Sequence, residues 1–182
     1  MAAQDAGEPE ASRLSRIRLL ALDVDGVLTD GRITYGAAGP PDEQPSFDVQ
    51  DGIAFRWMRD AGVVVAWISG RGSLAVGARA RELDVREVHL SAGSKREVLR
   101  GIQERLGIAV EETAAMGDDL PDLGLRARAG FFAAPANGRQ EIRERADLVT
   151  AAPGGRGAVR ELCETILRAK GRWQSILDGA DR

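Results

Sequence analysis

Short runs of apolar residues recur along most of the chain, and segments with apolar residues at helical spacing separate them. A short apolar run between turn residues is typical of a strand that is buried on both faces. The runs that predict strands cover residues 17–22, 63–68, 85–90, 113–116, 131–134 and 147–149. Strands that alternate with helices favour an α/β fold, because the helices cover both faces of a mainly parallel sheet.

Capping residues mark where the intervening helices begin. Asp51 is a candidate N-cap for the first helix, which Gly62 would end. Ser94, with Glu97 three positions later, forms a capping-box pattern for the third helix. The predicted helices cover residues 52–60, 74–83, 95–106, 120–127, 139–145 and 157–169. Together these elements predict a three-layer α/β sandwich with ligands at the carboxyl ends of the strands.

One segment, residues 31–50, interrupts the alternation. It has short apolar stretches around Ile33 and Phe47 on either side of a loop rich in glycine and proline, which favours a β-hairpin flap. The adjacent prolines at 40 and 41 leave a long unstructured loop as the alternative. Residues 1–16 show no clear period and are expected to form a disordered or loosely attached tail, so residues 17–182 make up one domain.

Composition limits the partners of this domain. The chain has 182 residues, 43% of them apolar, and a formal net charge of −3, with no basic stripe for nucleic acid or an anionic membrane. Its apolar runs are too short to cross a bilayer, and the N-terminus lacks the apolar core of a signal peptide. A cytoplasmic protein with a small-molecule partner is therefore expected.

The scarcity of soft ligands limits the choice of metal. Cys163 is the only cysteine, which excludes an internal disulfide, and His89 is the only histidine. A zinc site of several imidazoles and thiolates is thus excluded. A catalytic metal must rest mainly on oxygen ligands, which favours Mg²⁺.

Two carboxylates follow the first predicted strand. Asp23 and Asp25 are two residues apart, so both side chains project to one side, and Gly26 lets the backbone approach an anion closely. Phosphoryl transfer through a covalent intermediate requires a carboxylate nucleophile and a carboxyl group that protonates the leaving oxygen. Asp23 and Asp25 fit these roles in that order.

The next two strands also end in polar residues. Ser69 and Gly70 follow the second strand, where a hydroxyl and backbone N–H groups can bind phosphoryl oxygens. Arg71 either pairs with a substrate carboxylate or lies in solvent. Lys95 opens the helix after the third strand, where its ammonium can neutralise a phosphate and hold the nucleophile.

A group of acidic residues follows the fourth strand. Asp118 is the candidate that completes a Mg²⁺ site with Asp23 and the backbone carbonyl of Asp25, because this ion prefers hard oxygen ligands. Asp119 and Asp122 either orient the lysine or cap the following helix. Asp119 is also included among the candidate substrate-binding residues.

These four elements resemble the four motifs of the haloacid dehalogenase superfamily. The chain from Ile17 onward is similar to the 3-deoxy-D-manno-octulosonate (KDO) 8-phosphate phosphatase family, through residues 22–31, the flap end at 47–52 and the glycine-rich segment 152–161. The resemblance implies a Rossmann-like fold, Mg²⁺, a role in lipopolysaccharide biosynthesis and a homotetramer whose subunits complete one another's sites. One departure is Ser91, which stands where the family usually has glycine.

The resemblance also implies a role for each candidate residue. Asp23 is expected to be the nucleophile, Asp25 the general acid and base, Ser69 and Lys95 the phosphate ligands, and Asp118 the metal ligand. The expected reaction is hydrolysis of KDO 8-phosphate through an aspartyl-phosphate. The alternatives are a nonulosonate 9-phosphate substrate, a signalling module that stores the phosphoryl group, and a protein that keeps the fold without activity.

The chain has no segment long enough for the separate cap domain found in many members of the superfamily. Residues 32–50 and 72–94 occupy the two places where a cap would be inserted. The site is therefore expected either to stay open, which would admit a phosphoprotein, or to be closed by the flap and a neighbouring subunit. Closure would exclude water and strengthen the electrostatics of transfer.

Overall fold

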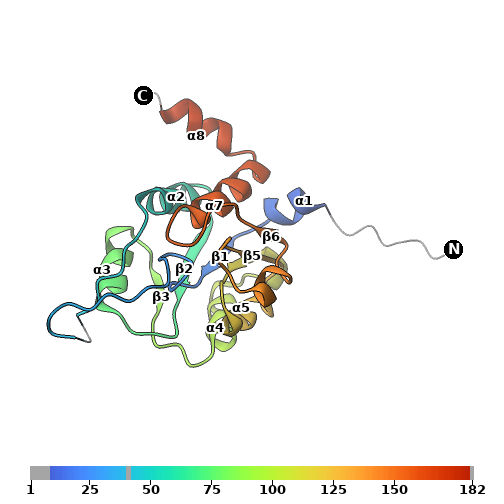
Figure 1. The fold of residues 1–182 in the computed structure, drawn as a ribbon. Helices are drawn as coiled ribbons and strands as arrows, with labels where there is room; N and C mark the ends of the chain where they lie inside the picture. Colours follow the sequence, from blue (N-terminus) through green and yellow to red (C-terminus); the bar gives the residue numbers. More distant parts are fainter. Residues whose placement is uncertain (1–8, 40–41, 181–182) are drawn as a thin grey trace.

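The computed structural model describes residues 9–39 and 42–180, and a six-stranded sheet forms the centre of this part of the chain. Its strands are β1 (Leu19–Leu22), β2 (Val64–Ile68), β3 (Glu87–His89), β4 (Thr113–Met116), β5 (Phe131–Ala134) and β6 (Leu148–Val149). Neighbouring strands are all parallel, in the order β3-β2-β1-β4-β5-β6 (Figure 1). Because β1 pairs with both β2 and β4, the carboxyl ends of these three strands are adjacent.

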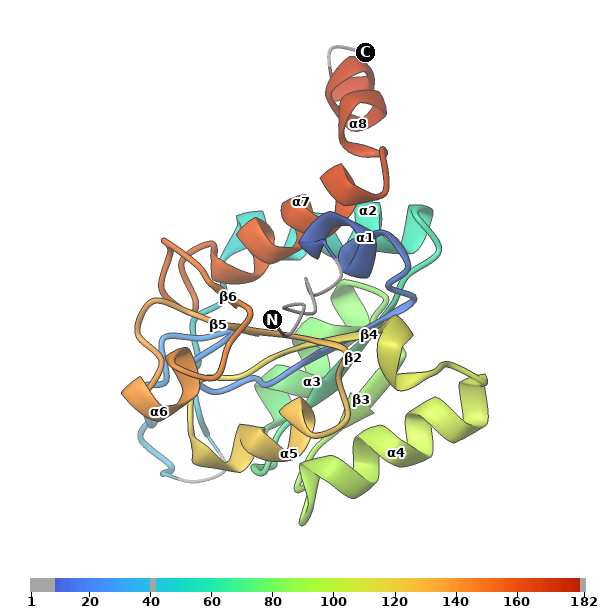
Figure 2. The same ribbon diagram turned by 90° about the vertical axis from the view of Figure 1, so that its right-hand side faces the viewer.

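Helices cover both faces of the sheet (Figure 2). One face carries α1 (Glu10–Ser15), α2 (Val49–Asp60), α3 (Leu74–Glu82) and α7 (Ala158–Ala169). The other carries α4 (Lys95–Leu106), α5 (Leu123–Arg126) and α6 (Gln140–Arg143). Side chains of β1 alternate between the two cores, with Leu20 and Leu22 in the first and Leu19 and Ala21 in the second. The predicted three-layer sandwich is confirmed, and the described residues include no cap domain.

The C-terminal helix α8 (Trp173–Ala180) was not predicted from the sequence. It extends away from the body of the molecule in both views (Figures 1 and 2). Trp173 holds its first turn, because its ring lies 5.7 Å from that of Trp57 on α2 and the Arg168 guanidinium of α7 lies 4.7 Å from the Trp173 ring. No helix in the described part of the chain is both long and apolar enough to span a bilayer.

Residues 10–16, predicted as part of a loose tail, belong to the fold instead. Helix α1 places Leu14 in the core, where it is 2% exposed, and Arg13 pairs with Asp147 at 2.9 Å. The prediction failed because a single buried leucine gives no period along the sequence, and its partners come from distant segments. The rest of the predicted tail, residues 1–8, lies outside the described residues.

Helix α2 begins at Val49, before its predicted start at residue 52, because Asp48 and not Asp51 is its N-cap. The Asp48 carboxylate accepts the Gln50 N–H at 2.7 Å. Asp51 is 2% exposed and accepts the N–H of Arg160, in the first turn of α7, at 2.7 Å. Burial, with the charge of Asp48, raises the pKa of Asp51 to about 6. Asp51 therefore joins the N-termini of two helices.

The flap is a minimal hairpin. A single antiparallel bridge joins Tyr35 and Glu43, and the Gln44 N–H donates to the Thr34 carbonyl oxygen at 2.9 Å. No β-strand forms in the described part of residues 31–50. The predicted hairpin is therefore present only as this one antiparallel bridge. Gly39, with a φ of +67°, turns the chain soon after the bridge and leaves few residues to pair. The prolines at 40 and 41 lie outside the described residues.

Candidate active site

Polar residues from four strand ends meet at the carboxyl edge of the sheet. Asp23 follows β1, Ser69 follows β2, Lys95 opens α4 after β3, and Asp118 follows β4. An open cavity of about 350 Å³ lies there. Its lining residues are Asp23, Asp25, Gly31, Gly70, Arg71, Lys95, Asp118, Asp119, Pro121 and Asp122. A larger cavity of about 430 Å³ opens near the amino ends of β2 and β3, but the described cluster of candidate metal ligands lies in the smaller one.

Lys95 lies at the centre of the charge network. Its ammonium nitrogen is 2.6 Å from Asp23 Oδ1 and 2.5 Å from Asp122 Oδ1, and the side chain is 8% exposed. Burial lowers the pKa of Lys95, but the two carboxylates outweigh burial and raise the pKa above its ordinary value. The lysine is therefore charged at neutral pH and holds Asp23 in place.

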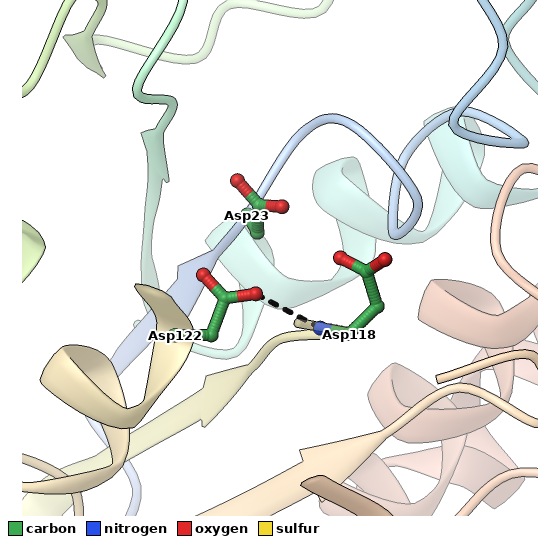
Figure 3. Close-up of side chains that lie close together, drawn as sticks. All are labelled: Asp23, Asp118 and Asp122. Atoms are coloured by element: carbon green, nitrogen blue, oxygen red, sulfur yellow. Dashed lines mark hydrogen bonds between the residues drawn. The ribbon is translucent and has the colours of Figure 1, made fainter. Parts of the chain in front are cut away.

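Asp122, and not Asp119, holds the lysine. Its second oxygen accepts the backbone N–H of Asp118 at 2.9 Å (Figure 3). The same oxygen accepts the backbone N–H of Asp119 at 3.2 Å. Asp119 instead accepts the N–H of Leu120 and caps the short helix η2 (Leu120–Asp122). Since both aspartates lie in one acidic turn, the sequence did not show which of them contacts Lys95 and which caps the helix.

Asp23 and Asp118 are the carboxylates best placed for a metal ion. Ligand oxygens of Asp23, Asp118 and Asp122 all lie within 4.8 Å of one another. Asp118 Oδ1 is buried without a hydrogen-bond partner in the described part of the chain, a costly arrangement that a bound cation would relieve. Both oxygens of Asp122 already accept hydrogen bonds. The donor set therefore fits Mg²⁺ held by Asp23 and Asp118.

The loop after β1 approaches this cluster closely because Gly26 has no side chain. Its φ is +96°, and a Cβ atom there would lie 2.2 Å from Asp118 Oδ2. The backbone beside Asp25 is thus next to the Asp118 carboxylate. A carbonyl ligand from Asp25, as predicted from the sequence, requires this closeness.

Crowding of the carboxylates changes their acidity. Burial raises the pKa of Asp23 to about 8, the charge of Asp122 adds to this, and Lys95 acts against it. Burial and the charge of Asp122 raise the pKa of Asp118 to about 6. With all three carboxylates ionised, the cluster would carry more negative charge than Lys95 neutralises. A divalent cation would offset this excess and favour the ionised forms.

Residues that follow β2 hold Asp25. Ser69 Oγ donates to Asp25 Oδ2 at 3.1 Å and accepts the Arg71 N–H at 3.0 Å. Arg71 Nε lies 3.8 Å from Asp25 Oδ1, and the same guanidinium pairs with Glu43 of the flap. Arg71 therefore faces the site and is not a purely solvent-exposed side chain. Sequence reasoning missed Glu43, because no local motif marks it.

Ser91, which replaces the glycine usual in the family, has a φ of +55°. This left-handed conformation is one that glycine adopts without strain. The Ser91 N–H donates to the Arg71 carbonyl oxygen at 3.0 Å, and the Ala92 N–H donates to that of Ser69 at 2.9 Å. The loop before Lys95 therefore adopts a left-handed turn at Ser91 and is joined by these two hydrogen bonds to the loop after β2.

A second support that the sequence did not reveal is Asn137, which follows β5. Its Oδ1 accepts the Gly154 N–H at 2.6 Å, and its Nδ2 donates to the Gly26 carbonyl oxygen at 3.4 Å. The Gly155 N–H also donates to the Val27 carbonyl oxygen at 2.9 Å. The glycine-rich segment before α7 therefore packs directly on the loop that carries Asp25.

A parallel sheet with carboxylates, a serine and a lysine at successive strand ends defines a hydrolase of the haloacid dehalogenase class. Residues 51–161 match the family model described as haloacid dehalogenase-like hydrolase. The chain is 35% identical to the 3-deoxy-D-manno-octulosonate 8-phosphate phosphatase of Haemophilus influenzae over 168 residues, which cover 92% of each protein. The chain belongs to this family of phosphatases.

Solved structures agree with this assignment. The enzyme of the same name from Moraxella catarrhalis, in complex with magnesium, phosphate and KDO, is 38% identical with a TM-score of 0.89, over 93% of this chain and 96% of that one. The cobalt-bound Haemophilus influenzae phosphatase is 35% identical with a TM-score of 0.84, over 88% of this chain and 93% of that one.

Proposed function

We propose that this phosphatase uses Mg²⁺ to hydrolyse KDO 8-phosphate to KDO and phosphate. The observation that carries the proposal is the convergence of Asp23, Asp118 and Lys95, with the unpartnered Asp118 oxygen facing a cluster of carboxylates. Support for the substrate comes from the similar Moraxella catarrhalis enzyme, whose structure contains magnesium, phosphate and KDO.

In the proposed mechanism, a carboxylate oxygen of Asp23 forms a bond to phosphorus while the bond from phosphorus to the sugar oxygen breaks. Asp25 gives a proton to that oxygen and later removes one from the water that hydrolyses the aspartyl-phosphate. Lys95, the Ser69 hydroxyl and the Gly70 N–H bind the phosphoryl oxygens. Bound Mg²⁺ would reduce the repulsion between Asp23 and the phosphoryl group.

Two further residues are proposed to contact the substrate. Arg71 lines the cavity and can pair with the sugar carboxylate, since a guanidinium binds a planar carboxylate through two N–H groups. Asp119 also lines the cavity and stays a candidate substrate contact.

We also propose that the protein is a cytoplasmic homotetramer. Six of the eight large apolar side chains exposed in the described residues lie on the flap, in the first two turns of α2, in the first turn of α3, or on η2: Ile33, Tyr35, Val49, Ile53, Leu74 and Leu120. Exposed apolar surface of this kind marks contact sites, and neighbouring subunits here would cover the mouth of the cavity. The cytoplasmic location rests on the charge of the sugar phosphate, which does not cross a membrane unaided.

A substrate panel tests the proposal. Purified protein with Mg²⁺ is assayed against KDO 8-phosphate, a nonulosonate 9-phosphate and a neutral hexose phosphate. We expect the highest kcat/KM for KDO 8-phosphate, and Asp23→Asn should lower turnover by about 10⁴-fold or more without lowering the Tm. Asp60→Asn, a surface control on α2, should leave both unchanged.

The other outcomes are equally informative. Preference for the nine-carbon acid would reassign the substrate within the same mechanism. Absence of turnover for every acidic sugar phosphate would contradict the proposed substrate class. A long-lived phosphorylated protein after exposure to a phosphodonor would indicate a signalling module instead.

A further inference from the structure

Arg71 is held between two carboxylates that come from different parts of the chain. Its Nη2 pairs with Glu43 Oε1 on the flap, and its Nε lies 3.8 Å from Asp25 Oδ1 after β1. The Arg71 side chain is 39% exposed, whereas that of Glu43 is 15% exposed. Arg71 also lines the active-site cavity. Its guanidinium thus connects the flap, the general acid and the space that the leaving group would fill.

The flap brings Glu43 to this position through its backbone. Glu43 forms the antiparallel bridge with Tyr35, and the neighbouring Gln44 N–H donates to Thr34. The hairpin positions the backbone of Glu43, and the ion pair of Glu43 with Arg71 then connects the flap to the loop after β2. Only the Glu43 side of this ion pair is mostly buried, so water screens the pair in part. The buried carboxylate still gives the more exposed guanidinium a fixed partner.

A long arginine side chain loses much conformational freedom when it binds a ligand. A residue that already holds it in the bound position reduces this loss and so increases affinity. Glu43 pairs with Nη2, Tyr35 adds a side-chain hydrogen bond to the guanidinium, and Nε lies buried beside Asp25. An incoming carboxylate would bind the N–H groups of Arg71 that these contacts leave. A carboxylate that enters the cavity would then meet donors that are already oriented.

We propose that Glu43 is a positioning residue that orients Arg71 toward the carboxylate of an acidic sugar phosphate. The inference rests on the proposed function, because it concerns the substrate class of the same site. It assigns to the flap a part in selecting substrates that carry a carboxylate in addition to the phosphate. Glu43 acts through Arg71 and does not touch the reacting atoms.

The test compares a substrate that has a carboxylate with one that lacks it. Glu43→Gln and Glu43→Ala are assayed on KDO 8-phosphate and on p-nitrophenyl phosphate with saturating Mg²⁺. We expect KM for KDO 8-phosphate to rise about tenfold or more, with kcat changed by less than about threefold. Both parameters for p-nitrophenyl phosphate should stay at wild-type values. Glu104→Gln, which removes an exposed pairing with Arg100 on α4, is the matched control.

A double-substitution cycle shows whether Glu43 acts through Arg71. After Arg71→Ala, the further change Glu43→Ala should add little to the KM for KDO 8-phosphate, because the group that Glu43 orients is absent. Additive effects of the two substitutions would overturn the proposal. So would an equal loss on both substrates, which indicates a structural role, or a lower KM for KDO 8-phosphate, which indicates that Glu43 competes with the substrate for Arg71.

The two proposals fail in different ways. If wild-type protein hydrolyses p-nitrophenyl phosphate but no acidic sugar phosphate, the proposed function is wrong, and the inference falls with it. If wild-type protein hydrolyses KDO 8-phosphate and the Glu43 variants match it, only the inference is wrong.

Discussion

At the scale of single residues, the site contains three neighbouring carboxylates but only one buried cationic side chain, that of Lys95, among the described residues. Lys95 is a buried cation that contacts Asp23 and Asp122, while Asp118 stands nearby with a buried oxygen that has no hydrogen-bond partner among the described residues. Burying unpaired charge destabilises a folded protein by several kcal/mol per ion, of the order of 3–5 kcal/mol when one partner is missing. Such an arrangement persists where function requires it, and the proposed binding of a cation and then a phosphoryl group at this site would supply that requirement.

Removal of the metal should make stability fall as the pH rises. The pKa values of Asp23 (about 8) and Asp118 (about 6) lie above the ordinary carboxylate value, so the metal-free folded state keeps protons that the unfolded state releases. This stabilising contribution is complete below about pH 4 and is lost as the pH rises through about 6 and then 8. We therefore expect the Tm of chelator-treated protein to decrease between about pH 5 and 8.

Added Mg²⁺ should have the opposite effect, because it binds the deprotonated carboxylates and its affinity increases with pH. Differential scanning fluorimetry across this pH range, with a chelator or with Mg²⁺, measures both trends. Asp118→Asn should reduce the pH dependence and the response to Mg²⁺ together. A Tm that changes in neither condition would show that these carboxylates are neither strained nor metal ligands.

At the scale of elements, the site depends on loops that approach one another more closely than side chains allow. A Cβ atom at Gly154 would lie 1.8 Å from the Gly26 carbonyl oxygen. The segment before α7 therefore packs against the β1 loop backbone to backbone, which keeps Asp25 in place. A segment near the C-terminal end of the chain thus supports the position of Asp25, which follows the N-terminal strand β1.

Gly154→Ala should therefore damage stability and activity together. The methyl group must displace the Gly26 backbone, and overpacking of this kind costs about 1–3 kcal/mol. Gly101→Ala is the matched control, because Gly101 is in α4 with no atom near its Cβ position, and it should gain about 0.5–1 kcal/mol. Urea unfolding and turnover measure the two effects. A Gly154→Ala protein with wild-type activity would show that the close approach is not needed for catalysis.

Elements whose signals are local could be predicted from the sequence. β4 and β5 have the predicted bounds, since apolar runs buried on both faces are visible in the chain itself. Ser94 and Gly107 also mark the ends of α4 as predicted. Roles that depend on distant partners could not be assigned: Asp51 caps α7 only because Arg160 lies beside it in space, and Glu43 contacts Arg71 only when the flap folds over.

The same limit applies within the candidate site. The positions of Asp23, Ser69, Lys95 and Asp118 at strand ends followed from the motif pattern, and the structure brings them together. The motif pattern did not show which of Asp119 and Asp122 contacts Lys95, because an acidic turn can fold with either carboxylate toward the lysine. Helix α1 was missed because a single buried leucine gives no helical period. Helix α8 was missed although Trp173, Ile176 and Leu177 recur at helical spacing, so its local signal was available in the sequence.

At the scale of the whole molecule, a catalytic cavity without a cap domain needs another way to exclude water. Of the described flap residues, Gly31 lines the cavity and Glu43 pairs with Arg71, which also lines it. Val49 and Leu74, in the first turns of α2 and α3, are 77% and 76% exposed, the highest values among the large apolar side chains of the described residues. A second copy of the chain that covers these residues would remove apolar surface from water and close the cavity in the same step.

The combined change Val49→Glu and Leu74→Glu should therefore separate the subunits and lower activity. Charges at a buried contact between subunits are not compensated, whereas at a monomer surface they are solvated at little cost. Light scattering after size exclusion reports the mass, and kcat/KM on the acidic sugar phosphate reports the site. Val149→Glu, on the edge strand β6 and 42% exposed, is the control and should change neither. If the doubly charged variant keeps both the wild-type mass and the wild-type activity, these helix ends face solvent, and the flap alone must close the cavity.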